Sequence, residues 1–231
     1  MMGSIGSVLI DFDGTACSHD VAEHLLEEFG DPSWPSYDEA WERGEIGAAE
    51  ALVAQAAMLK GTDEEMLAFA LDHCPMDPTF EPFVSWLASE GIAASIVSDG
   101  FGFYIEPLLR SAGIADLPVV TNTWIAVSAS KLAFTNGHAV CRGCGTCKMS
   151  AAVRFRETHG SVAFIGEGPS DRFGALYSDV VFAKDELVEY CRIDGVPFQP
   201  YVNFDDVRRL LESGEPAPGP VAPSTCPGWR E

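Results

Sequence analysis

Basic residues are scarce in this chain of 231 residues, which carries 14 lysines and arginines against 35 aspartates and glutamates, for a net charge of −21. Such an acidic surface repels the phosphates of nucleic acids and anionic lipids. We therefore expect neither nucleic acid nor a membrane as a partner. An anionic substrate would need a local site built from a few basic side chains, backbone N–H groups or a metal ion.

Long apolar runs and evenly paired cysteines are also missing. No run approaches the ~20 apolar residues of a membrane-spanning helix, and we see no secretory leader before the first apolar segment. The seven cysteines are an odd number, and four of them are scattered singly. These features favour a cytoplasmic protein with reduced thiols. The hydrophobic content of 47% is that of a folded globular chain.

Near its N-terminus the chain has a short apolar segment that ends abruptly at two aspartates. Residues 8–10 have the composition of a buried strand, and the sequence DFDGT follows at residues 11–15. In extended backbone, Asp11 and Asp13 point to one side while Phe12 turns to the core. Two carboxylates at the end of a buried strand carry a desolvation cost unless a cation or a reaction uses them. The alternative is an ordinary Asp-Gly turn.

Other buried strands also end in polar, glycine-containing loops. Residues 92–97 lead into Ser98, and residues 162–165 lead into the sequence GEGPSD at residues 166–171. A further strand is expected at residues 180–183. Helical patterns between and after these strands cover residues 80–90, 101–112, 147–158 and 203–212. This alternation predicts an α/β fold with a doubly wound parallel sheet, whose ligands bind beyond the carboxyl ends of the strands.

The segment after the first strand is different, because residues 17–74 show helical patterns and no strand. Helices are expected at residues 19–29, 36–43, 46–60 and 62–72, with capping boxes at Ser36/Glu39 and Thr62/Glu65. We therefore predict a small helical cap at residues 17–74, inserted into a core formed by residues 1–16 and 75–212. A hairpin is expected around residues 124–135. Residues 213–231 are rich in proline and predict a flexible tail.

The strand-end loops would bring several polar side chains to one site. At least four carboxylates in such a cluster repel one another unless a divalent cation lies among them. An all-oxygen ligand set suits Mg²⁺. Hydroxyl groups and the backbone N–H groups around Gly100 would form a cradle for phosphate, and Lys148 could supply a point charge on a phosphoryl group. The converging side chains are those of Asp11, Asp13, Thr15, Ser98, Asp99, Glu167 and Asp171.

This arrangement resembles the haloacid dehalogenase (HAD) superfamily over nearly the whole chain. DFDGT is similar to its first motif, Ser98 to its second, Lys148 to its third and GEGPSD to its fourth. The helical block looks like the cap of the phosphoserine-phosphatase-like branch. Longer segments, VSDGFGFYI at 97–105, CGTCK at 144–148 and DVVFAKD at 179–185, resemble the methionine-salvage 2-hydroxy-3-keto-5-methylthiopentenyl-1-phosphate phosphatases. The phosphoethanolamine/phosphocholine phosphatases are near relatives of that group.

The resemblance implies a Mg²⁺-dependent hydrolase of small soluble phosphate esters. Asp11 would be the nucleophile that forms an aspartyl-phosphate, and Asp13 would protonate the leaving oxygen and then activate water. Lys148 would complete the catalytic set. The metal would be held by Asp11, the Asp13 carbonyl, Glu167 and Asp171, and the phosphate by Thr15, Ser98, Asp99, Gly100 and Lys148.

Two residues depart from the family pattern. Glu167 stands where the fourth motif more often has aspartate. Its extra methylene leaves open whether it binds Mg²⁺ directly or through water, and which role falls to Asp171. Asp99 stands where relatives often have glycine. We expect its carboxylate to turn away from the phosphate, with its backbone N–H group used instead.

Two groups of residues outside these motifs are weaker candidates. Asp20 and Arg43, in the predicted cap, could recognise the organic part of the substrate, or they could simply be solvated charges at helix ends. The cysteines of the segment CRGCGTC, namely Cys141, Cys144 and Cys147, could bind a structural zinc ion together with His138 or a distant cysteine. We favour instead a loop that shapes the approach to Lys148.

Several functions remain open at this level. A phosphoserine- or phosphocholine-type phosphatase, or a phosphotransferase that uses the same aspartyl-phosphate, would need the same motifs. A non-catalytic phosphate- or metal-binding module is a further alternative. The joint presence of Asp11, Asp13, Lys148 and Asp171 speaks against that module, because the loss of any one would disable the chemistry.

Overall fold

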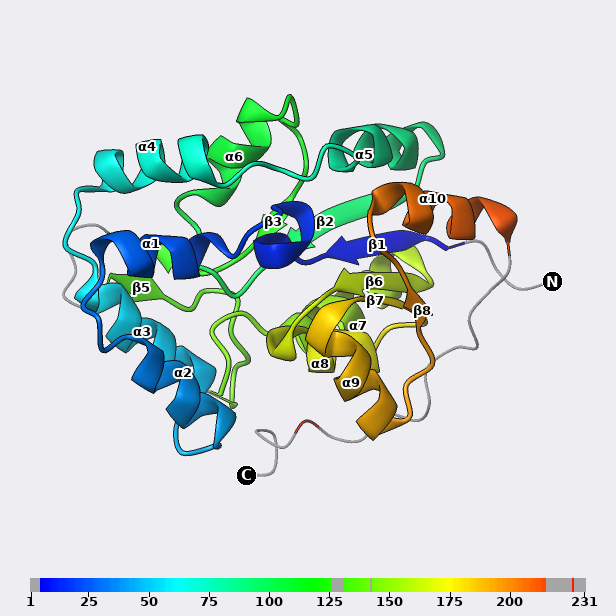
Figure 1. Cartoon of the computed structure of the whole chain (residues 1–231). Coiled ribbons are helices and arrows are strands. Elements are labelled where there is room, and N and C mark those ends of the chain that lie inside the picture. The colour runs from blue at the N-terminus through cyan, green and yellow to red at the C-terminus, as the bar shows by residue number, and fades with distance from the viewer. Residues whose placement is uncertain (1–4, 126–130, 142, 215–225, 227–231) are drawn as a thin grey trace.

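A computed structural model describes residues 5–125, 131–141, 143–214 and 226. Six strands form one sheet in the order β3-β2-β1-β6-β7-β8, and every neighbouring pair is parallel (Figure 1). The predicted doubly wound parallel sheet is therefore confirmed. The strands are β1 (Ser7–Ile10), β2 (Ala93–Val97), β3 (Val119–Val120), β6 (Val162–Gly166), β7 (Val180–Ala183) and β8 (Gln199–Pro200).

Strand β1 lies at the centre of the sheet, fully buried between β2 and β6. Its side chains alternate between the two faces, as a pleated strand requires. Val8 and Ile10 join one hydrophobic core, and Leu9 joins the other. The residues that follow β1 therefore emerge at the middle of the carboxyl edge, between the loops that follow β2 and β6.

Helices cover both faces of this sheet (Figure 1). Helices α5 and α10 pack over one face, and α7, α8 and α9 pack over the other. Their bounds are α5 (Phe80–Ser89), α6 (Ile105–Ser111), α7 (Lys148–His159), α8 (Arg172–Leu176), α9 (Asp185–Asp194) and α10 (Phe204–Ser213). Helix α6 begins later than predicted, so that Pro107 lies in its first turn, where a missing N–H group costs no hydrogen bond.

Residues 17–74, all of which the structure describes, contain four helices and no strand, as predicted. The helices are α1 (Val21–Phe29), α2 (Pro35–Glu42), α3 (Ala48–Met58) and α4 (Asp63–His73). The Thr62/Glu65 capping box opens α4 as predicted. The Ser36/Glu39 box is wrong, because Pro35 already begins α2 and the Ser36 hydroxyl donates to the Ser33 carbonyl instead. The division into core and cap stays a prediction.

A short antiparallel pair, β4 (Thr123–Trp124) with β5 (Leu132–Ala133), matches part of the predicted hairpin. Its contacts run to the helical block, where the Trp124 indole N–H donates to Asp63 and the Lys131 ammonium donates to the Leu59 carbonyl. Residues 126–130 of that hairpin lie outside the described residues. So do residues 215–225 and 227–231 of the predicted tail, whereas Ser213 belongs to α10.

The helices of the described residues are too short or too polar for a lipid bilayer. None of them combines the length and the apolar composition that crossing a membrane would require.

Candidate active site

The site begins at the turn Phe12–Ala16, which follows directly on β1. Asp11 is buried at the end of the strand, and its N–H group donates to the carbonyl of Ile165 in β6 at 2.9 Å. The backbone then reverses at Gly14, whose φ of +69° is a conformation that favours glycine. This turn places Asp13 beside Asp11 at the carboxyl edge of the sheet.

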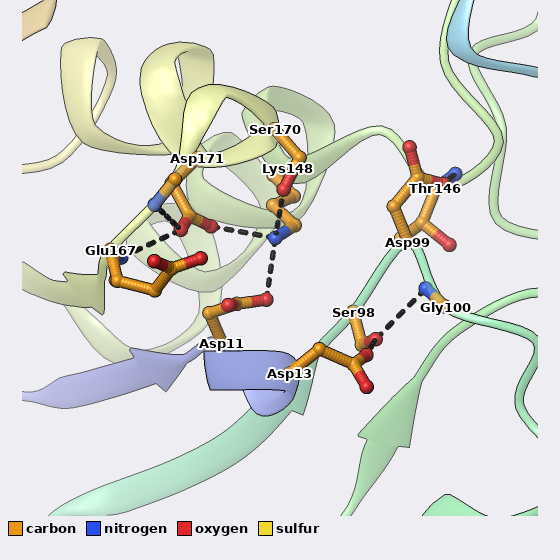
Figure 2. A network of polar contacts seen from close by, with 12 residues as sticks. Asp11, Asp13, Ser98, Asp99, Gly100, Thr146, Lys148, Glu167, Ser170 and Asp171 are labelled. Atoms are coloured by element: carbon orange, nitrogen blue, oxygen red, sulfur yellow. Dashed lines mark hydrogen bonds and ion pairs between the residues drawn. The ribbon is translucent and has the colours of Figure 1, made fainter. Parts of the chain in front are cut away.

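A buried lysine joins the first, third and fourth motifs (Figure 2). Lys148 is the first residue of α7, and its Nζ lies 2.6 Å from Asp11 Oδ1, 2.6 Å from Asp171 Oδ1 and 3.0 Å from Ser170 Oγ. Burial by itself would lower the pKa of Lys148. The two carboxylates outweigh that effect and raise the pKa above its ordinary value, so the lysine stays charged.

The carboxylates around this lysine repel one another. Burial, together with the charge of Asp171, raises the pKa of Asp11 to about 7, although Lys148 acts in the opposite direction. The pKa of Glu167 is raised to about 8, mainly by burial and then by the charges of Asp11 and Asp171. One ammonium group therefore does not balance the negative charge at this edge of the sheet.

The oxygens of these carboxylates are not equally free. Asp171 Oδ1 accepts from Lys148, and its Oδ2 accepts from the N–H groups of Glu167 at 2.9 Å and Gly168 at 3.1 Å. In the described part of the chain, no three His, Cys, Asp or Glu side chains are arranged around a metal position. The unbalanced carboxylates of Asp11 and Glu167 nevertheless fit a hard divalent cation in charge and in donor chemistry.

Asp13 lies in a second hydrogen-bond network, on the side of the loop that follows β2 (Figure 2). Its carboxylate accepts from Ser98 Oγ at 3.1 Å, from the hydroxyl of Tyr104 at 3.0 Å and from the N–H group of Val21 at 3.1 Å. The pKa of Asp13 is raised well above its ordinary value, mainly by burial and then by the charges of Asp20 and Asp11. A raised pKa favours the protonated form of this carboxyl group, which is the form that can give a proton to a bound group.

The Asp99 carboxylate is committed to the neighbouring loops. Its Oδ1 accepts from the N–H group of Thr146 at 2.6 Å and from Asn122 Nδ2 at 3.1 Å. Asn122 also donates to the backbone carbonyls of Asp99 and Gly100. The Gly100 N–H group itself donates to Ser98 Oγ at 3.0 Å. Asp99 thus ties the loop after β2 to the cysteine-containing loop before α7.

Tyr104 and Asn122 are site residues that the sequence analysis did not single out. Tyr104 is fully buried and lies inside the segment VSDGFGFYI, so that segment held a usable signal. Asn122 lies outside every recognised motif, and its contacts depend on how β3 and the cysteine loop come together. No local pattern marks it.

An open cleft of about 490 Å³ lies above these residues, between the loops and helices α1–α3. Asp11, Asp13, Gly100 and Glu167 line it, together with Asp99. Ser98, Lys148 and Asp171 are buried directly behind this surface. The structure therefore brings together most of the predicted catalytic, phosphate-binding and metal-binding side chains.

Two predicted residues have no place in this cleft, and a third does. Thr15 is buried and is not among the described residues that line the cleft. Arg43 pairs with Glu45 and Glu39 on the exposed side of α2, so the structure gives its predicted substrate role no support. Asp20 does line the cleft, while its Oδ1 caps α1 by accepting from the N–H group of Glu23 at 2.8 Å.

The cysteine loop lies against the lysine. Cys141, Cys144 and Cys147 line a small cavity beside Lys148, together with Cys226 from near the C-terminus. Among the described residues, none of these four cysteines forms a disulfide, and burial raises the pKa of Cys144. Because these thiols are not arranged around a metal position, the structure gives the zinc hypothesis no support. The loop's position fits a part in shaping the surroundings of Lys148.

Known proteins are similar to this chain in sequence and in fold. The family model of haloacid dehalogenase-like hydrolases matches residues 8–173. A 2-hydroxy-3-keto-5-methylthiopentenyl-1-phosphate phosphatase of Brevibacillus brevis is 28% identical, over 87% of this chain and 93% of the relative. An enzyme of the same name from Lysinibacillus sphaericus is 27% identical, over 91% of this chain and 97% of the relative.

Solved structures show the same fold at lower identity. A substrate-bound phosphoserine phosphatase superposes with a TM-score of 0.66 at 16% identity, over 90% of this chain and 99% of that one. A phosphoserine phosphohydrolase-like protein from Francisella tularensis superposes with a TM-score of 0.65 at 20% identity, over 89% and 99%.

The family match spans more than half of the chain and includes all four motif regions. This chain therefore belongs to the haloacid dehalogenase-like hydrolases. Within that superfamily it is an enzyme of the phosphatase class, whose members generally use Mg²⁺.

Proposed function

We propose that the protein is a Mg²⁺-dependent phosphomonoester hydrolase that works through an aspartyl-phosphate on Asp11. The observation that carries the proposal is the buried contact of Lys148 with both Asp11 and Asp171. This contact holds a carboxylate at the end of a central strand, at the floor of an open cleft. A charged lysine there also favours the approach of a phosphoryl group that the acidic surroundings would otherwise repel.

The reaction would proceed in two displacements. An Asp11 oxygen attacks phosphorus, the bond from phosphorus to the ester oxygen breaks, and Asp13 gives its proton to that leaving oxygen. A water molecule then attacks the aspartyl-phosphate, Asp13 takes a proton from it, and the Asp11 carboxylate is released with inorganic phosphate. The raised pKa of Asp13 suits the first transfer, because the carboxyl group must be protonated when the ester binds.

Mg²⁺ would be held by the carboxylates of Asp11 and Glu167 and by the backbone carbonyl of Asp13. Bound there, it would neutralise charge on the phosphoryl oxygens. Asp171 is better suited to positioning, because both of its oxygens already accept hydrogen bonds from Lys148 and from backbone N–H groups. Glu167 and Asp11 both keep oxygens for a metal.

The names of the relatives suggest a particular substrate, the 2-hydroxy-3-keto-5-methylthiopentenyl-1-phosphate of methionine salvage. At identities of 28% and 27%, this ester is one candidate substrate within the proposed phosphatase function. A phosphoserine- or phosphocholine-type phosphatase and a phosphotransferase use the same floor of the site. The lining of the cleft, and not its floor, distinguishes among these esters.

The test is phosphate release from a panel of small phosphate esters with Mg²⁺. We compare wild type, Asp11→Asn and, as a matched control, Asp72→Asn, because Asp72 lies on α4 with its side chain 82% exposed. We expect turnover by wild type and Asp72→Asn, loss of turnover in Asp11→Asn, and loss on chelation of the metal. An acid-quenched reaction should also leave a phosphoryl group on the peptide that contains Asp11. Turnover by Asp11→Asn at the wild-type rate would overturn the proposed nucleophile.

A further inference from the structure

The lining of the cleft is strongly one-sided in charge. Ten acidic residues line a space of about 490 Å³, and no lysine or arginine is among the described residues that line it. Metal binding and catalysis account for the carboxylates at the floor, near Lys148. They do not account for the rest. The ten are Asp11, Asp13, Asp20, Glu23, Asp38, Glu42, Asp99, Glu167, Asp185 and Glu186.

The end of the cleft formed by α1 and α2 combines acidic and aromatic side chains. Asp20, Glu23, Asp38 and Glu42 line it, and so do the two tryptophans of this segment, Trp34 and Trp41. This end faces the catalytic floor across the same continuous space. It is therefore where the organic part of a bound phosphate ester would lie.

These acidic side chains are held close enough to disturb one another. Partial burial raises the pKa of Glu23 and of Asp38, and the charge of Asp20 adds to both shifts. Asp38 is also fixed in place, because the buried Gln55 donates from Nε2 to its Oδ1 at 2.8 Å. A positive group between α1 and α2 would relieve this repulsion, and a second negative group would increase it.

From this lining we infer that the preferred ester carries a positive charge on its organic part, as a primary or quaternary ammonium group. The inference rests on the proposed phosphatase function and names its substrate class. Carboxylates attract the cation, and indole faces bind ammonium groups through their electron-rich surface. The substrate named for the relatives has hydroxy, keto and methylthio groups and no cationic group. Its methylthio group would suit the tryptophans, but the acidic side chains would gain no charged partner from it.

An organic cation fits this end of the cleft better than a second metal ion. Indole rings offer no ligand to a strongly hydrated divalent cation, whereas they favour weakly hydrated ammonium groups. One oxygen of Asp38 already accepts from Gln55. Phosphoserine is a poorer fit than a simple amine ester, because the described lining offers no basic side chain to its carboxylate.

The sharpest test compares two esters of the same shape. Phosphocholine and 3,3-dimethylbutyl phosphate differ in a single atom, a charged nitrogen against a neutral carbon. Phosphate release from each is measured at saturating Mg²⁺. We expect kcat/KM to favour phosphocholine by ~10- to 100-fold, mostly through KM, and this preference to shrink as salt is added. Equal kcat/KM values for the two esters at saturating Mg²⁺ would overturn the inference.

A matched pair of variants tests whether residues of the cleft cause the preference for phosphocholine. Glu42→Gln and Glu39→Gln lie on the same helix, but Glu42 lines the cleft whereas Glu39 faces Arg43 at the exposed surface. We expect Glu42→Gln to lower the phosphocholine preference by about 3-fold, and Glu42→Gln with Asp38→Asn to lower it further. Glu39→Gln should keep the wild-type ratio. An equal drop in both single variants would mean general surface charge, not recognition.

Binding separates this inference from the catalytic proposal. The Asp11→Asn variant is titrated with both esters by calorimetry, in the presence of Mg²⁺. If wild type hydrolyses no ester yet the variant binds phosphocholine at least about 10-fold tighter than its neutral isostere, the phosphatase proposal fails and the cleft assignment stands. If wild type hydrolyses esters but neither kcat/KM nor binding distinguishes the pair, the cleft assignment fails alone.

Discussion

Lys148 is the residue whose removal should be most damaging, because it is buried between two carboxylates. The side chains of Lys148, Asp11 and Asp171 are 2%, 6% and 0% exposed, and both ion pairs measure 2.6 Å. At an effective dielectric constant of about 20, each pair contributes ~6 kcal/mol of attraction before desolvation is counted. Much of that offsets the burial of the charges. Removing one partner of such a cluster costs about 3–5 kcal/mol, because an uncompensated charge stays buried.

We therefore expect Lys148→Met to lose about 3–5 kcal/mol of unfolding free energy along with its phosphatase activity. Urea denaturation followed by circular dichroism, at pH 8 and without divalent metal, measures the loss. Lys60→Met is the matched control, since Lys60 is 72% exposed and lies 3.7 Å from Asp31. It should stay within about 0.5 kcal/mol of wild type.

A double-mutant cycle tests whether the loss comes from this ion pair. Asp171→Asn removes one of the two buried charges that Lys148 balances. In the Lys148→Met background it should therefore cost less than in wild type, with a coupling energy of at least about 1 kcal/mol. If the two substitutions add independently, or if Lys148→Met is within about 1 kcal/mol of wild type, the buried contact is not present as described.

Two further predictions concern the glycine of the second motif and the titration of the site. A Cβ at Gly100 would lie 2.2 Å from the Tyr104 hydroxyl oxygen and 2.6 Å from Asp13 Oδ2. Gly100→Ala should therefore displace Asp13 and lower kcat/KM by ~100-fold. Phosphate-release kinetics at the wild-type level would contradict this prediction. Folding raises the pKa values of Asp11 and Glu167 to about 7 and about 8, above those of an unfolded chain. Between these values the folded protein binds more protons than the unfolded chain. The stability of the metal-free protein should therefore fall as the pH rises from about 4 through 8. Mg²⁺ should then raise Tm more at pH 8.5 than at pH 5.5, and a gain independent of pH in thermal melts would refute the shared titration.

The sequence predicted the floor of the site well because its residues follow directly on buried strands. Asp11, Ser98 and Glu167 each directly follow a strand of the sheet, and parallel strands place such residues at one edge. Lys148 was found from a motif, not from a strand end. The ion pairs that fix it cross 137 and 23 residues of sequence, so only the folded chain shows them.

Other features, such as the start of α2 and the contacts of Arg43, depend on which of several neighbouring residues forms an interaction, and a local sequence pattern does not show this. Ser36 and Glu39 have the spacing of a capping box, yet Pro35 is pre-organised for the first helical position and begins α2 one residue earlier. The short elements α8 and β8 escaped the sequence analysis, because five and two residues are too few to show a period. The sequence left Arg43 as either a substrate contact or a solvated charge at a helix end, and the nearby Glu39 and Glu45 hold its guanidinium at the surface, as the second alternative expects.

Part of the chain's negative charge lines the cleft, where it bears on the choice of substrate. A net charge of −21 first suggested that an anionic substrate needs a local island of positive charge. The island at the floor is a single buried lysine that two carboxylates already balance. Phosphate can be bound there against the surrounding acids when further positive charge arrives with it. Mg²⁺ would supply part of that charge at the floor. A cationic organic group on the ester would supply the rest between α1 and α2, so that the acidic lining selects the substrate instead of repelling it.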